Sequence, residues 1–176
     1  LTEVPAETIA LYTTSSNLFD LGSNEVTAAA DEAIGSDTLL LKKIARIFNY
    51  VQERIKPGGH PEFFTARDII RRGEGSAEER IILLSALCRQ KGIPTRLLAT
   101  EKSRLLQIYL APYGWLILDP VDGGFFIGGE LILQQQSDYL NFLYQGWDSG
   151  IQVRRNGVWI RAKDLPRAKI SEKVDY

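Results

Sequence analysis

The chain contains one cysteine and one histidine, side chains that can form a nucleophile and its base when they lie together. Cys88 lies near the end of an apolar run, whereas His60 lies upstream of it in a proline- and glycine-rich segment, 57–61. No spacing pattern relates the two. One cysteine excludes a disulfide framework and multi-cysteine metal sites, and one histidine excludes zinc sites that need several. We therefore expect neither a metal nor a cofactor.

The stretch from Gly73 to Cys88 is the most informative part of the chain. Ser76 and Glu79 form the S-x-x-E pattern of a capping box, which predicts that a helix begins here. After its first turn this helix is apolar nearly all round, which is typical of a helix buried in a core. Ser76 has two interpretations. A replacement nucleophile would need a general base, whereas an N-cap needs nothing further, and we favour the cap.

Helical patterns precede this segment. Ser23 or Asn24 can cap a short helix, and Asp37 can cap a longer amphipathic one. Thr65 can cap a third helix, over 66–72. Three helices therefore lead to the predicted buried helix.

The pattern changes to strands after it. Apolar residues alternate over 106–110, a second apolar run covers 115–118, and Asn156-Gly157 predicts a two-residue hairpin turn. Helices followed by antiparallel strands indicate an α+β domain, with a buried helix packed on a sheet. We expect one domain over 1–176, with its motif core at about 66–124 and C-terminal strands and a hairpin in 125–165.

Composition limits the class of protein. The 176 residues are 44% apolar and 24% charged, with a formal net charge of −1, which is typical of a globular domain and gives no electrostatic case for binding nucleic acid. No apolar stretch approaches the roughly 20 residues that cross a bilayer. The chain starts at Leu1 and contains no Met, so we interpret it as an excised segment or a processed chain.

Three short motifs follow one another along the chain: Ala86-Leu87-Cys88-Arg89, Gly92-Ile93-Pro94-Thr95-Arg96, and Gly114-Trp115 with Asp119-Pro120. Together with Gly75 before the helix, this order resembles the transglutaminase-like superfamily, whose fold is papain-like. In active members a Cys opens the buried helix, a His lies on the next strand and an Asp on the strand after it. The helix N-terminus favours the thiolate, the His pairs with it, and the Asp orients the imidazole.

The resemblance implies that the nucleophile is missing. Counting back from Gly92 places the Cys position at Ala77, or at Ser76 if the loop slips by one residue. Cys88 lies eleven positions beyond Ala77, about 16 Å at ~1.5 Å per residue, so it cannot substitute.

The resemblance also implies that the base is missing. Counting back from Trp115 places the His position near Ser103, and only Asp119 is retained. Asp119 is either a remnant of the orienting group or, as we favour, an anchor of the turn that contains Pro120. We therefore expect no catalysis, with Ala77 and Ser103 as degenerate catalytic positions.

One branch of the superfamily resembles the chain further downstream. It is the bacterial family of inactive transglutaminase-like domains that are fused to seven transmembrane helices. Segments 119–124, 130–133, 145–150 and 151–155 resemble its order of glycine loop, apolar strand, glycine turn and final strand. The resemblance implies a domain on the periplasmic side of the inner membrane that signals to attached transmembrane helices, with a link to peptide-modification systems that include ATP-grasp ligases.

We expect a non-catalytic sensory domain whose cleft recognises a peptide or peptide-like ligand near Ser76, Ala77, Ser103 and Asp119. One alternative is a hydrolase or acyltransferase with a site rebuilt on Ser76, and another is a structural spacer or dimerisation module. Arginines are numerous around the motif. They are either solvated helix and strand ends or, together with the helix N-terminus, a site for a peptide carboxylate: Arg71, Arg72, Arg80, Arg89, Arg96 and Arg104.

Overall fold

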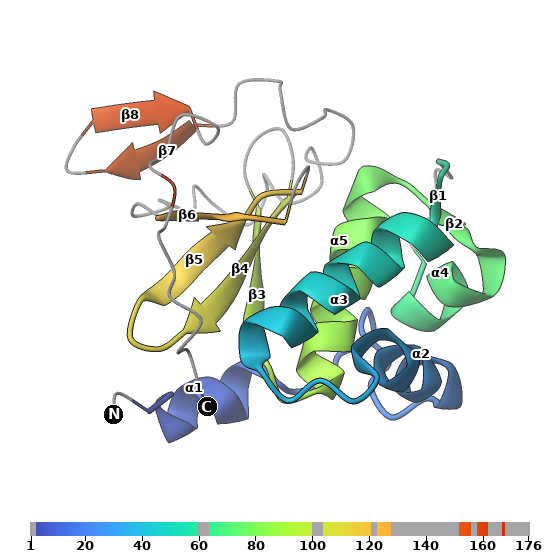
Figure 1. The fold of residues 1–176 in the computed structure, drawn as a ribbon. Helices are drawn as coiled ribbons and strands as arrows, with labels where there is room; N and C mark the ends of the chain where they lie inside the picture. Colours follow the sequence, from blue (N-terminus) through green and yellow to red (C-terminus); the bar gives the residue numbers. More distant parts are fainter. Residues whose placement is uncertain are drawn as a thin grey trace.

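The helices precede the strands of the main sheet along the chain, as the sequence predicts (Figure 1). The structure is a computed structural model that describes residues 3–59, 64–99, 104–120, 123–127, 152–155, 158–161 and 167. The helices in this part of the chain are α1 (Ala6–Tyr12), α2 (Asn24–Ile34), α3 (Leu40–Arg54), α4 (Ala66–Arg72) and α5 (Ala77–Gln90).

The main sheet is antiparallel, with its four strands in the order β3-β4-β5-β6. These strands are β3 (Thr95–Ala99), β4 (Arg104–Leu110), β5 (Gly114–Leu118) and β6 (Phe125–Ile127). Two short ladders accompany it, one parallel between β1 (Lys56–Pro57) and β2 (Glu74–Gly75), and one antiparallel between β7 (Gln152–Arg155) and β8 (Val158–Arg161). In the second ladder Arg155 pairs with Val158, so the predicted hairpin is confirmed.

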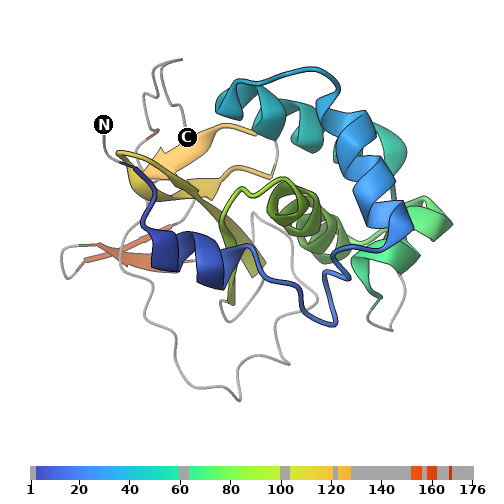
Figure 2. The same ribbon diagram turned by 90° about the horizontal axis from the view of Figure 1, so that it is seen from below.

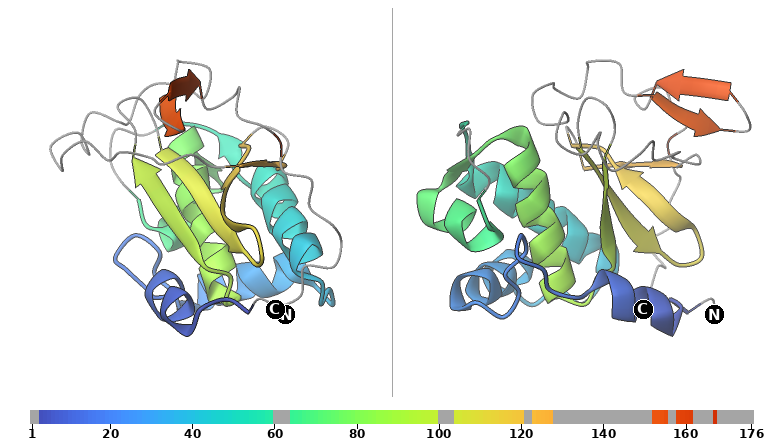
Figure 3. Two further views of the ribbon diagram at one scale, coloured as in Figure 1. Left: turned by 90° about the vertical axis from the view of Figure 1, so that its left-hand side faces the viewer. Right: turned by 180° about the vertical axis from the view of Figure 1, so that it is seen from behind.

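Helix α5 lies at the centre of the fold. It packs against α2, α3 and α4 on one side and against β3 and β4 on the other, so it separates the helical layer from the sheet (Figures 2 and 3). Leu83, Ala86, Leu87 and Cys88 have no exposed surface. Burial on all sides explains why the helix is apolar nearly all round, and it confirms the prediction of a buried central helix.

Local sequence signals set the starts of α4 and α5. Ser76 caps α5 and Thr65 caps α4, each through a reciprocal capping box. The prediction that Asp37 caps α3 is wrong, because the helix begins at Leu40 and Asp37 forms an ion pair with Arg46 instead. The carboxylate of Asp37 is thus used by the arginine rather than by the helix N-terminus.

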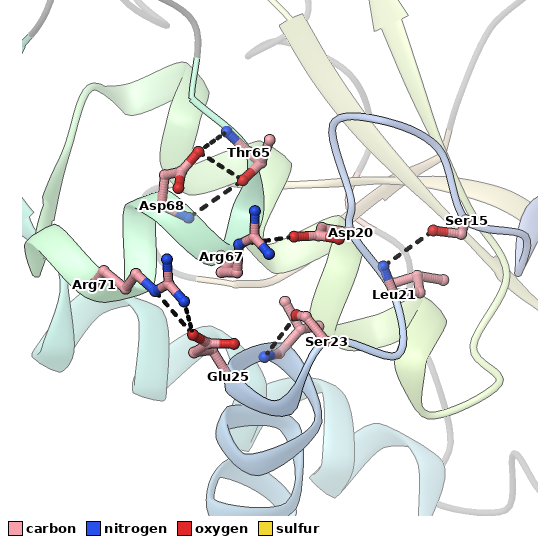
Figure 4. A network of polar contacts seen from close by, with 10 residues as sticks. Ser15, Asp20, Leu21, Ser23, Glu25, Thr65, Arg67, Asp68 and Arg71 are labelled. Atoms are coloured by element: carbon pink, nitrogen blue, oxygen red, sulfur yellow. Dashed lines mark hydrogen bonds and ion pairs between the residues drawn. The ribbon is translucent and has the colours of Figure 1, made fainter.

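A polar network ties α2 to α4 (Figure 4). Ser23 caps α2 by accepting a hydrogen bond from the Val26 amide. Glu25, in the first turn of the same helix, accepts hydrogen bonds from Arg71 at the end of α4. These contacts hold the two helices together at the surface, while their apolar faces pack on α5.

Candidate functional site

The start of α5 is occupied by a closed set of hydrogen bonds. The Ser76 hydroxyl accepts from the Glu79 amide at 3.2 Å, and the Ser76 amide donates to the Glu79 carboxylate at 2.8 Å. Arg72 donates to the other oxygen of that carboxylate at 2.7 Å. Glu79 is only 4% exposed and is therefore a buried, paired acid. The geometry gives Ser76 the N-cap role that the sequence predicts.

Ala77, the first residue of α5, is exposed and lines a small pocket. The pocket lies between α3, α5 and the β4–β5 side of the sheet and has a cavity volume of about 70 Å³. Most of its wall is aliphatic or aromatic carbon. The lining residues are Phe48, Val51, Gln52, Ala77, Arg80, Ile81, Leu84, Leu105, Leu106, Leu118 and Pro120.

Polar groups occupy one part of this pocket wall. Arg80 donates a hydrogen bond to the side-chain carbonyl of Gln52, whose amide nitrogen donates to the Pro120 carbonyl at 3.3 Å. Gln52 thus links α5 to the loop after β5. Partial burial lowers the pKa of the Arg80 guanidinium, which still stays protonated at neutral pH.

Asp119 directly follows β5 and is 5% exposed. Its amide donates to the Gly124 carbonyl at 2.8 Å, and its carbonyl accepts from the Gly123 amide at 3.0 Å, so its main chain takes part in the turn, while the role of its side chain stays a prediction. Its carboxylate accepts a hydrogen bond from Arg167 at 2.7 Å, a partner that sequence spacing could not identify. Pro120, the next residue, lines the pocket.

The structure brings together only some of the predicted site residues. Ala77 lines the pocket, and so does Pro120, which directly follows Asp119. Ser76 precedes Ala77 and belongs to the capping box. Ser103 and His60 lie outside the described residues. Cys88 is fully buried within α5, and burial raises the pKa of its thiol to about 12. Within the described residues, no three His, Cys, Asp or Glu side chains are grouped to hold a metal ion.

The arginines around the motif have different surroundings. Arg71 and Arg72 form ion pairs with glutamates. Arg89 and Arg96 contact uncharged groups instead. Arg89 donates hydrogen bonds to Thr95 and lies over the ring of Phe19. Arg96 donates a hydrogen bond to Gln107 and lies over the ring of Trp115. The side chain of the sixth, Arg104, lies outside the described part. Arg80 differs from the other described arginines because it lines the pocket.

Sequence reasoning missed the wall that α3 contributes. Phe48, Val51 and Gln52 reach the pocket from a helix distant in sequence from the motifs. The helical spacing of apolar residues in α3 identified a buried face. Nothing in that spacing marked Gln52, at the edge of the face, as a partner of Arg80.

Comparisons with known proteins bear on the family and the fold of the chain. The family model of the transglutaminase-like superfamily matches residues 27–120. No curated protein matches the chain. Among solved structures, a candidate cysteine protease from Cytophaga hutchinsonii aligns with a TM-score of 0.54 and 18% identity, over 69% of this chain and 44% of that protein. The chain therefore spans less than half the length of that neighbour, and the likeness concerns the fold. No helix in the described part is both long and apolar enough to cross a membrane.

Proposed function

The chain belongs to the transglutaminase-like superfamily, and from this membership we propose that it is a non-catalytic domain that uses the superfamily's cleft to bind a ligand. One observation carries the proposal. Ala77, which the resemblance places where active relatives have a thiol, is the exposed first residue of the central helix and lines a largely apolar pocket. A methyl group has neither a lone pair nor a proton to transfer, so it can contact a ligand but cannot attack one.

We propose that the ligand is a peptide or a peptide-like molecule. The pocket joins an apolar floor to a wall of arginine, amide and carbonyl groups, a combination that suits an amino-acid side chain with its attached backbone. The resemblance to the inactive bacterial branch supports a location on the periplasmic side of the inner membrane. In that location the domain would report ligand binding to transmembrane helices of the same protein.

A binding screen tests this proposal. Short peptides with free and blocked termini are added to the purified chain, and the melting temperature and ligand-observed NMR signals are measured. We expect a subset to raise the melting temperature, because a ligand that binds only the folded state stabilises it. Ala77→Leu should abolish the effect by filling the pocket, whereas Ala6→Leu, at the exposed first residue of α1, should not. If no peptide binds the wild-type chain, a spacer or dimerisation role replaces the proposal.

A second experiment tests the alternative of an enzyme rebuilt on Ser76. The Ser76 hydroxyl accepts a hydrogen bond from the Glu79 amide, while the Glu79 carboxylate accepts hydrogen bonds from Arg72 and from the Ser76 amide. These bonds favour a capping role for the hydroxyl over that of a nucleophile. We expect no covalent adduct with a fluorophosphonate probe and no turnover of labelled esters or amides. An adduct on Ser76 that disappears in Ser76→Ala would favour the enzyme.

A further inference from the structure

We propose that the pocket recognises the C-terminus of a peptide whose last residue has a short aliphatic side chain, and that Arg80 binds the terminal carboxylate. This inference rests on the proposed function, because it names the ligand class of the same cleft. It commits to a peptide end rather than to a free carboxylic acid.

The size and lining of the pocket define the apolar part of this ligand. The residues that line the pocket with Ala77 include Leu84, Leu106 and Leu118, which belong to the core cluster around α5 and are each less than 5% exposed overall. A cavity of about 150 Å³ accommodates benzene. The volume here is about 70 Å³, which suits a short branched aliphatic group better than an aromatic ring. Burial of such a group would contribute hydrophobic binding energy.

Arg80 provides the charge complementarity. It is the one charged side chain among the described residues that line the pocket. Its side-chain hydrogen bond goes to the neutral amide of Gln52, and its Nε atom is buried without a hydrogen-bond partner in the described part of the chain. A partly desolvated cation without an anion is electrostatically uncompensated. A ligand carboxylate would supply the missing charge through charge-assisted hydrogen bonds.

The neighbouring arginines make a useful contrast. Arg71 and Arg72 lie close in sequence to the same helix start, but Glu25 and Glu79 already neutralise them. The sequence marked several arginines as candidates for binding a carboxylate. Among them, Arg80 lines the pocket and has no ion-pair partner in the described part of the chain.

The amide groups beside Arg80 favour a peptide over a free acid. Gln52 and the Pro120 carbonyl place a hydrogen-bond donor and acceptors at the same part of the wall. The last residue of a peptide carries an amide N–H next to its carboxylate, which can donate to such acceptors. A simple branched acid has the carboxylate and the alkyl group but lacks this N–H.

Calorimetry with three probes tests the inference on the full chain. The probes are N-acetyl-L-valine, its uncharged amide N-acetyl-L-valinamide, and isovalerate. We expect N-acetyl-L-valine to bind at least tenfold more tightly than either of the others. Arg80→Met, which keeps much of the apolar stem, should remove the preference for the acid over the amide, and Arg80→Lys should retain part of it. Arg71→Met, on α4 and away from the pocket lining, is the matched control and should keep the preference.

The possible outcomes separate this inference from the proposed function. Equal affinity for acid and amide, or an unchanged preference in a folded Arg80→Met variant, overturns the role of Arg80. Isovalerate binding as tightly as N-acetyl-L-valine overturns the peptide assignment. If library peptides with blocked C-termini bind and Ala77→Leu blocks them, the inference fails while the proposed function stands. If no probe and no library peptide binds, both fail.

Discussion

At the scale of single residues, two positions on one helix show how surroundings decide chemistry. Ala77 is exposed at the first turn of α5, where the free amides and the helix dipole would favour a thiolate. Cys88 lies three turns further along, fully buried among apolar side chains. Burial without a positive partner disfavours the thiolate, so the side chain packs as a small apolar group.

This contrast predicts a large difference in thiol reactivity. With its pKa raised to about 12, Cys88 has a thiolate fraction on the order of 10⁻⁴ at pH 8, and its sulfur is inaccessible to reagent. The folded wild-type chain should therefore remain unlabelled by iodoacetamide while Ala77→Cys incorporates one label, as measured by mass spectrometry. Both cysteines should react after unfolding in urea. Labelling of the native wild-type chain at the rate of the variant would contradict the burial of Cys88.

A second prediction concerns Gly123, which comes close to the pocket wall. Its φ of +73° is strained for other residues, and an added Cβ would lie 3.0 Å from the ring of Phe48. Gly123→Ala should therefore lower the free energy of unfolding by about 1–3 kcal/mol and move a pocket-lining side chain. Denaturant unfolding measures the first effect and peptide affinity the second. Gly22→Ala is the control, since its φ of +83° is equally strained but an added Cβ would meet nothing within 4 Å. Equal losses of stability and affinity in the two variants would contradict the contact with Phe48.

At the scale of elements, signals that act over a few residues could be read from the sequence. Ser76 and Thr65 cap their helices through side chains three positions apart, and the hairpin between β7 and β8 lies where Asn156-Gly157 predicts it. Each signal satisfies backbone groups locally, so its effect depends little on the rest of the fold.

Contacts between distant segments could not be read in the same way. Asp37 has a suitable side chain for a cap, yet it pairs with Arg46. Gln52 contacts Arg80 and Pro120 only because α3, α5 and the sheet meet at the pocket. The sequence placed Ala77 at the cleft through its motifs, but the polar part of the wall arises from tertiary packing, for which one sequence holds no periodic signal.

The capping box of α4 predicts how stability depends on pH. Hydrogen bonds from the Thr65 side chain and backbone lower the pKa of Asp68 below its ordinary value. Its contribution to stability is therefore complete above the pKa of the unfolded chain, near 4, and is lost as the pH falls through the lower folded-state value. Asp68→Asn should melt at a lower temperature than the wild type at pH 7, and the gap should narrow towards pH 2.5. Glu53→Gln, on the exposed face of α3, is the control. A constant gap across this range would show that the charge of Asp68 is not involved.

At the scale of the whole molecule, α5 lies between the helices and the main sheet, and α3 also contacts the loop after β5 directly. The helical layer packs on one side of it and the sheet on the other (Figure 2). The match to the transglutaminase-like superfamily, over residues 27–120, includes both layers and begins within α2. The pocket lies where the layers meet, so its walls depend on α5 holding them in register. By contrast, α1 has no buried residue, and its Leu11 is 64% exposed to solvent.

This architecture predicts one cooperative unit that excludes α1. Leu83→Ala removes a fully buried side chain from α5 and should cost about 2–5 kcal/mol. Because both layers share this helix, amide hydrogen exchange in α3, α5 and β4 should accelerate together, by a factor that matches the loss of global stability. Exchange in α1 should be fast in both proteins, because this short helix has no buried residue. Ile9→Ala, on exposed α1, should leave exchange in α5 unchanged. Faster exchange in the helices with an unaltered sheet would mean that the layers unfold separately, and that α5 does not couple the two walls of the pocket.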